Sequence, residues 1–351
     1  MAKILKIPVY LSLSFALLFG LACGSDQDDS LEETDSSKKI SLNTNTDVPD
    51  RSGTAEAKAK AEAEAKAKAE AEAKAKAVIV IDALGNEIEF DDIPDKVATI
   101  SPTATEMLYA AGGVSVLRDR ASKYPAEVTE LPNVGSAYNP SIEEIVKAKP
   151  DLVIIEALTQ ARFIPVLAQA GLKVMAVKAE TKEDITSNIL NIGKVIGKES
   201  EAIDKIKDID NRLSEIGSED GRTVLLLISD QDRNLYAARP ESYTGLIAQT
   251  IGMVNKAAGL PDAGPYPGFA LMSPESILMA DPDVIIALSP APPPAPRLSN
   301  MLTQIPPFAG LKAIRTGSIL EGDVDLFLQS PGPRIVEAVE FLKKGLDSSK
   351  K

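Results

Sequence analysis

The chain has 351 residues, 44% of them hydrophobic, with a single cysteine and no histidine. Its length allows about two domains, and its net charge of −13 argues against a nucleic-acid partner, because an acidic surface repels phosphate backbones. The missing histidine excludes Ser-His-Asp and Cys-His catalysis, the usual zinc sites and a histidine ligand to haem, and Cys23 alone forms no intrachain disulfide.

Residues 1–23 have the pattern of an export signal. A charged start precedes an apolar run from Ile7 to Leu21, about 15 residues long, whereas a transmembrane helix needs about 20. The run leads into a small residue and Cys23, which resembles a bacterial lipobox, although Gly20 stands where leucine is usual. We expect cleavage before Cys23 and acylation of that cysteine. An uncleaved anchor and an ordinary secretory signal are the alternatives.

Two segments of biased composition follow the signal. Residues 24–54 are acidic and nearly free of large apolar side chains, which predicts disorder. Residues 55–77 repeat Ala, Glu and Lys, and glutamates precede lysines by four residues, the favourable order on a helix. Because this helix would have no apolar stripe to bury, we expect a semi-rigid spacer. A self-assembling strand is the alternative, which the poor strand propensity of alanine disfavours.

From Val78 onward the pattern is typical of an α/β protein. Helical stretches alternate with short β-rich runs at 96–100, 151–156, 173–177, 223–229 and 283–289. Such alternation predicts βαβ units and parallel sheets. We expect two Rossmann-like lobes, at 78–197 and 218–351, joined by one long helix at 198–217. Ligands bind beyond the carboxyl ends of parallel strands, which places the ligand cleft between the lobes.

An internal repeat supports two similar lobes. Residues 141–154 and 273–286 share seven of fourteen positions at an offset of 132. Each copy reads as a helix capped by serine, a Pro-Asp turn and a buried strand. Glu143 and Glu275 fall in the first helical turns, where a carboxylate gains up to about 1 kcal/mol from the helix dipole without any partner.

Four segments together resemble a family of periplasmic metal-chelate binding proteins, which includes receptors for cobalamin, haem and ferric siderophores. The resemblance extends over about residues 80–346 and is strongest at 100–113, 122–154, 271–286 and 330–342. It implies two α/β lobes with a single rigid inter-lobe helix, a ligand in the cleft, and delivery to the permease and ATPase of an ABC importer. It also implies that one glutamate per lobe docks on permease arginines, and Glu143 and Glu275 are the matching positions.

The cleft residues are expected in segments that follow strands, because a large planar chelate needs aromatic walls and a few polar groups. The candidates are Ser101, Thr103, Tyr124, Tyr138, Tyr266, Phe269 and Arg297. Each aromatic residue has the alternative of packing on its own lobe, and Arg297 has that of a solvated side chain. No metal site is expected, since Asp230 and Asp232 supply too few oxygens for a hard cation.

No convergent acid–base set is evident, so we expect binding and delivery without catalysis and without a cofactor beyond the ligand. Cobalamin or a related corrinoid is the expected ligand, and a ferric siderophore or haem, ligated by Tyr124, is the alternative. A surface adhesion or scaffold lipoprotein is the alternative of another class. We expect a monomer outside the cytoplasm, held at the membrane by a lipid on Cys23, in a periplasm or on an outer surface.

Overall fold

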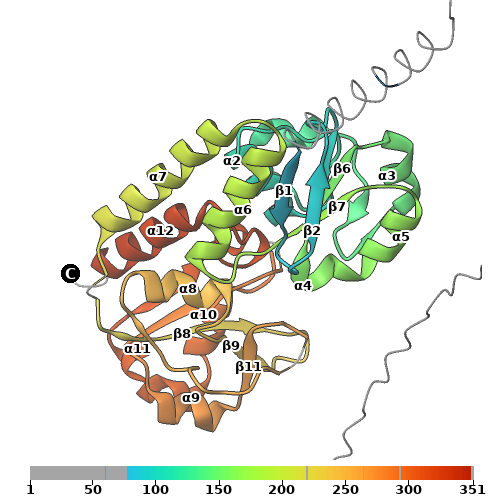
Figure 1. Ribbon diagram of the computed structural model, residues 1–351. Coiled ribbons are helices and arrows are strands. Elements are labelled where there is room, and N and C mark those ends of the chain that lie inside the picture. Colours follow the sequence, from blue (N-terminus) through green and yellow to red (C-terminus); the bar gives the residue numbers. More distant parts are fainter. Residues whose placement is uncertain (1–59, 61–76, 219, 264, 292–293, 349–351) are drawn as a thin grey trace, which may run out of the picture. The chain divides into compact units, whose positions relative to one another are not determined.

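The computed structural model describes residues 60, 77–218, 220–263, 265–291 and 294–348 (Figure 1). The predicted signal with Cys23, the acidic linker and nearly all of the Ala/Glu/Lys repeat therefore lie outside the described residues. The chain divides into two units, residues 1–60 and 61–351, and every element below belongs to the second. Across the described part of the chain, no helix has both the length and the apolar character needed to cross a membrane.

The first sheet has three parallel strands in the order β3-β6-β7, as the alternating pattern predicts. Neighbouring side chains pack on opposite faces: Leu152 and Ile154 belong to one buried cluster, Val153 and Ile155 to another. Helices cover both faces, which is why these strands are mainly apolar. We call residues 78–195 the first half and residues 223–348 the second half. The elements of the first half are β1 (Val78–Ile81), β2 (Glu87–Phe90), β3 (Val97–Thr99), α2 (Pro102–Ala110), η1 (Ala126–Glu130), β4 (Gly135–Ser136), β5 (Asn139–Pro140), α3 (Ile142–Ala148), β6 (Leu152–Glu156), α4 (Ala157–Gln160), η2 (Ala161–Phe163), α5 (Ile164–Gln169), β7 (Val174–Val177) and α6 (Lys182–Val195).

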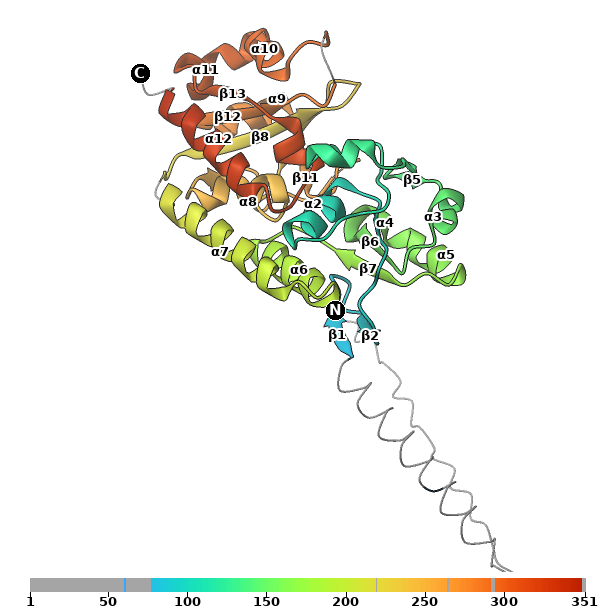
Figure 2. The same cartoon turned by 90° about the horizontal axis from the view of Figure 1, so that it is seen from above.

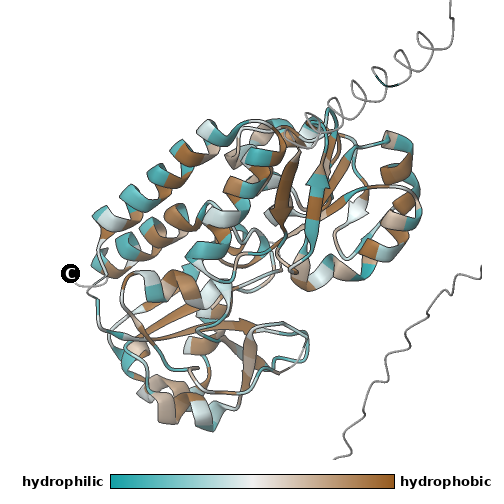
Figure 3. Ribbon diagram, in the orientation of Figure 1, coloured by the Kyte–Doolittle hydropathy of each residue, from teal (hydrophilic) through white to brown (hydrophobic). Residues whose placement is uncertain are grey.

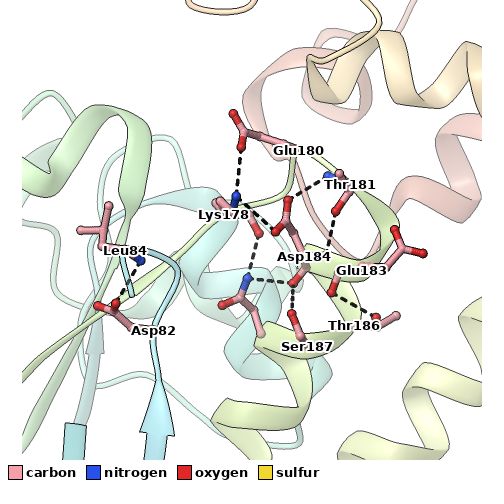
Figure 4. A network of polar contacts seen from close by, with 10 residues as sticks. Asp82, Leu84, Lys178, Glu180, Thr181, Glu183, Asp184, Thr186 and Ser187 are labelled. Carbon is pink, nitrogen blue, oxygen red and sulfur yellow. Dashed lines mark hydrogen bonds and ion pairs between the residues drawn. The ribbon is translucent and has the colours of Figure 1, made fainter. Parts of the chain in front are cut away.

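Helix α6 begins with a reciprocal cap. The Thr181 hydroxyl accepts from the backbone N–H of Asp184 at 3.0 Å, and the Asp184 carboxylate accepts from the backbone N–H of Thr181 at 3.0 Å. Lys178 adds ion pairs of 3.2 Å to Glu180 and 3.4 Å to Asp184 (Figure 4). Such a capping box satisfies N–H groups that the helix itself leaves unpaired, and it therefore stabilises the start of α6 at this position.

The second sheet is parallel at its centre, as expected, because β12 pairs in parallel with β8 and β13, but two antiparallel strands that the sequence pattern did not predict extend one edge. Its strands follow the order β11-β9-β8-β12-β13, with β10 paired to β8, and β9 and β11 run antiparallel to their neighbours. The reversal occurs in the loop after β8, where Asp230 accepts from the backbone N–H of Asn234 at 2.8 Å and Arg233 adopts a φ of 64°. The elements are β8 (Thr223–Ser229), β9 (Leu235–Ala238), α8 (Tyr243–Thr250), β10 (Val254–Asn255), β11 (Phe269–Met272), α9 (Pro274–Ala280), β12 (Val284–Leu288), α10 (Leu298–Thr303), η3 (Pro306–Gly310), α11 (Lys312–Arg315), β13 (Ile319–Gly322), η4 (Asp325–Gln329) and α12 (Ile335–Ser348).

Helix α7 (Glu199–Ile216) lies in the sequence between the strands of the two sheets, where the long polar helix is expected. It buries Ala202, Ile209 and Leu213, and it packs against both α6 and α12 (Figure 2). Its remaining positions are largely hydrophilic (Figure 3). The amphipathic stripe seen in the sequence is therefore the contact of α7 with a helix from each half.

Candidate functional site

Glu143 and Glu275 occupy equivalent exposed positions at the starts of α3 and α9. A serine precedes each helix, and its hydroxyl accepts from a backbone N–H three residues on, at 3.3 Å in α3 and 3.2 Å in α9. The Glu275 carboxylate lies near its own backbone N–H and the hydroxyl of Ser273, and these hydrogen bonds lower its pKa. Both carboxylates are open to a partner.

The repeat continues beyond these helices into the neighbouring strands. Each helix ends in a residue with a left-handed backbone, followed by the Pro-Asp turn. Asp151 accepts from the backbone N–H of Lys96 at 2.8 Å, just before β3, and Asp283 accepts from that of Thr223 at 2.7 Å, at the start of β8. The sequence repeat is therefore also a repeat of tertiary contacts, which places the two glutamates at matching points of the two halves.

The serine and the threonine among the cleft candidates are buried at the start of α2. The Ser101 hydroxyl accepts from the backbone N–H of Ala104 at 3.2 Å and caps the helix. Thr103 lies in the first turn with 2% of its surface exposed. Both residues shape the carboxyl end of β3, but as placed they expose almost no surface to a ligand. Arg297 is half-buried directly before α10.

The aromatic candidates fall into two groups. Tyr266 is half-buried, with its ring centroid 5.3 Å from that of Tyr236 and 6.3 Å from that of Phe269, and Phe269 is itself only 3% exposed. Tyr124 and Tyr138 lie on loops of the first half and are 48% and 67% exposed. The structure therefore brings Tyr266 into contact with both Tyr236 and Phe269, and it leaves the rings of Tyr124 and Tyr138 open.

Sequence reasoning missed an ion pair between the halves. The buried carboxylate of Glu106, in α2, accepts from Arg334 Nε at 2.9 Å and from Arg334 Nη2 at 2.6 Å. The Arg334 guanidinium also lies 4.5 Å from the ring centroid of Tyr124. Burial raises the pKa of Glu106, an effect that the neighbouring guanidinium only partly offsets. The only signal in the sequence is that both charged residues fall inside segments 100–113 and 330–342, which carry the family resemblance.

Two hollows lie away from these residues. One, of about 630 Å³, is lined by the C-terminal ends of α7 and α12, and another, of about 330 Å³, by the segment after β2 with Asp151 and Lys173. Neither is lined by a predicted cleft residue. Among the residues that the structure describes, no cluster of acidic or cysteine side chains is arranged to hold a metal ion.

Comparison with known proteins identifies the family to which this chain belongs. The family model for periplasmic binding proteins matches residues 97–326. The uncharacterized ABC transporter substrate-binding lipoprotein YvrC of Bacillus subtilis is 26% identical over 282 residues, covering 77% of this chain and 85% of that protein. A cobalamin-binding protein of Halobacterium salinarum is 25% identical over 267 residues, covering 73% of this chain and 70% of that protein. The crystal structure of the petrobactin-binding protein YclQ of Bacillus subtilis matches with a TM-score of 0.67 at 19% identity, covering 77% of this chain and 99% of that one.

Proposed function

Because this chain belongs to the periplasmic binding protein family, we propose that it captures cobalamin or a related corrinoid and delivers it to an ABC importer. That it is a substrate-binding protein and not an enzyme is confirmed by the family match and by the YvrC relative. The corrinoid is our finer proposal. A relative named as a cobalamin-binding protein supports it, and so does the absence of histidine, which removes the usual haem ligand.

The ligand site in this proposal lies between the two halves, beyond the carboxyl ends of β3 and β8. Tyr124, Tyr138 and Tyr266 supply aromatic surface to the ligand, while the buried Ser101, Thr103 and Phe269 support the walls from behind, with Arg297 at the rim. The observation that carries the proposal is the exposed ring of Tyr124, backed by a guanidinium from the other half. Rings of this kind suit the apolar face of a large planar chelate.

The test is a ligand titration of the purified full-length protein with cyanocobalamin, haemin and a ferric catecholate, each followed by its own absorption band. We expect saturable binding of cyanocobalamin at a stoichiometry near one. Tighter binding of haemin or the ferric catecholate would replace the corrinoid by the alternative ligand. Failure to bind any of the three would contradict a metal-chelate receptor.

Delivery requires a partner, and the two exposed glutamates suit one. We propose that Glu143 and Glu275 dock on arginines of the permease, whose ATPase then drives uptake. In this proposal α7 acts as the rigid connector between the lobes, because it packs against α6 and α12 along its buried stripe. A rigid connector keeps the two glutamates at a fixed spacing, which is what a two-point docking surface needs.

We also propose that a lipid on Cys23 holds the chain outside the cytoplasm, consistent with a relative that is named as a lipoprotein. Replacing the acylated thiol by a hydroxyl removes the anchor, so Cys23→Ser should move the protein from the membrane fraction to the soluble fraction. Fractionation with antibody detection checks this result. Retention of the variant on the membrane at the wild-type level would point to the uncleaved anchor instead.

A further inference from the structure

The contact between Glu106 and Arg334 joins residues far apart in the sequence. Glu106 belongs to α2, in the first half, and Arg334 directly precedes α12, the last helix of the second half. Only 2% of the Glu106 side chain and 17% of the Arg334 side chain are exposed. A buried charge pair of this geometry is costly to break, because the partner left behind keeps an uncompensated charge away from water. The pair therefore defines how α2 meets the start of α12.

The guanidinium of Arg334 makes two kinds of contact, hydrogen bonds along one edge and a stacking contact with its face. Its Nε–Nη2 edge bonds both carboxylate oxygens of Glu106, while its carbon lies 4.5 Å from the ring centroid of Tyr124. A planar guanidinium can make both contacts at once, whereas the ammonium of lysine cannot. Because Tyr124 remains 48% exposed, the contact supports the ring and still leaves much of it open.

The loop that carries Tyr124 is held from the first half as well. Arg118 donates through its Nη atoms to backbone carbonyls of the loop, among them those of Asp119 at 3.1 Å and Thr129 at 3.0 Å. The buried carboxylate of Asp119 accepts from the hydroxyl of Ser122, whose oxygen lies 3.0 Å from that of Thr105 in α2. The loop is thus fixed to α2, and Glu106 on the same helix fixes Arg334.

We propose that Arg334 is a positioning residue for ligand binding. Its ion pair with Glu106 of the first half fixes its guanidinium, and the guanidinium holds the ring of Tyr124 toward the ligand. This inference rests on the proposed function for the identity of the ligand. The new point is that a residue of the second half, Arg334, sets the orientation of an aromatic ring that belongs to the first half. Arg334 acts through Tyr124, since its charge is already neutralised by Glu106.

The chain offers a matched control in Arg212. Its Nη2 donates to Glu340 at 2.8 Å and its Nη1 to Glu337 at 3.4 Å, so it also links two helices, α7 and α12, through carboxylates. Within the described residues it stacks on no aromatic ring. Arg334→Lys and Arg212→Lys therefore both replace an inter-helix guanidinium, and only the first removes support from Tyr124.

The experiment measures hydrogen exchange over residues 119–130 and cyanocobalamin affinity in the full-length variants. We expect Arg334→Lys to speed exchange in this loop and to weaken binding about tenfold, and Arg212→Lys to change either by less than about twofold. Unchanged exchange in Arg334→Lys would overturn the proposal whatever the ligand is. Faster exchange in a protein that does not bind cyanocobalamin would support the positioning role and overturn the corrinoid ligand instead.

A double-mutant cycle tests whether Arg334 works through the ring. Tyr124→Leu should weaken binding about as much as Arg334→Lys, Tyr124→Phe should keep it within about twofold, and the combined Arg334→Lys and Tyr124→Leu variant should bind no more weakly than Tyr124→Leu alone. Additive losses would overturn the proposed role. If Arg334→Lys does not fold, Glu106→Gln replaces it in both measurements, because glutamine keeps the shape of the Glu106 side chain and weakens its bonds to Arg334.

Discussion

The segments α3–β6 and α9–β12 carry the same sequence pattern, yet their aspartates have different numbers of partners. Both have a serine cap, a left-handed C-terminus and an aspartate that bonds the neighbouring strand. Asp151 is exposed and accepts one backbone N–H, that of Lys96. Asp283 is half-buried, accepts both the N–H and the hydroxyl of Thr223, and also contacts the ammonium of Lys312.

The difference shows what the repeat encodes. The shared residues determine the path of the chain from helix to strand, and with it the place of Glu143 and Glu275. The number of partners at the aspartate depends on residues outside the repeat, since Lys312 comes from α11, which follows β12 and lies beyond the repeated segment. The repeat thus duplicates the positions of the two glutamates, whereas it does not duplicate the contacts made by the two aspartates.

The largest effect is expected where the two segments act together. Reversing both charges, by Glu143→Lys and Glu275→Lys, should abolish transport into vesicles and importer-stimulated ATP hydrolysis, because leaving docking charges unpaired costs about 2–5 kcal/mol. Ligand affinity should stay within a few-fold, since both side chains are exposed helix-start residues. The control pairs ligand titration with transport in the same preparation. Lost binding with intact docking would assign the glutamates to the ligand site, and no change would reduce them to helix-start residues.

The two aspartates offer the second comparison. Asp283→Ala should destabilise the protein by about 2–3 kcal/mol, because it leaves the N–H and the hydroxyl of Thr223 and the ammonium of Lys312 without their shared acceptor. Asp151→Ala should cost about 1 kcal/mol, because the exposed N–H of Lys96 can bond water. Chemical denaturation of both variants measures the difference. Equal losses would mean that the partners outside the repeat add nothing to stability.

The pH dependence of stability sharpens the same contrast. The Lys312 ammonium and the N–H and hydroxyl of Thr223 lower the pKa of Asp283 from an ordinary value of 3.8 to about 2. The folded state therefore binds this proton less readily than the unfolded chain, and the stabilisation is present above about pH 4 and is lost as the pH falls toward about 2. It amounts to about 2 kcal/mol at 1.36 kcal/mol per pKa unit. Asp283→Asn should flatten the acid limb of a denaturation series by that amount, and an unaltered limb would contradict the assignment.

Much of the fold could be predicted from the residues alone. The apolar runs at 151–156 and 223–229 became strands β6 and β8 almost to the residue, because buried parallel strands read as continuous apolar stretches. Strands β9 and β11 were missed, since each is only four residues long, is apolar at every position and therefore carries little periodicity. Their antiparallel pairing depends on the turn at Asp230, whose side-chain bonds are not visible in a pattern of apolar residues.

The candidate site was less predictable than the fold. The exposure of Glu143 and Glu275 follows from helix periodicity, since Ile145 and Ile277 take the buried positions two residues on. The ion pair of Glu106 and Arg334 could not be foreseen, because the two residues are 228 positions apart and meet only through the packing of the two halves. Burial of Ser101 and Thr103 was likewise hidden, since a cap residue and a ligand-contacting hydroxyl look alike in sequence.

The smallest effect is expected on the outer faces of the two helices. Position 147 in α3 and position 279 in α9 correspond in the repeat, but Lys147 lies 3.4 Å from Glu144, whereas Met279 is 82% exposed. Because an exposed helical position far from any buried partner contributes little, Met279→Lys should change the free energy of unfolding by less than about 0.5 kcal/mol. Thermal denaturation checks stability, and transport assays with Lys147→Met as the reciprocal variant check docking. A loss of transport in Met279→Lys alone, at unchanged stability and ligand affinity, would show that the second helix docks through an apolar contact beside Glu275, so that the two docking points differ in chemistry although the repeat places them alike.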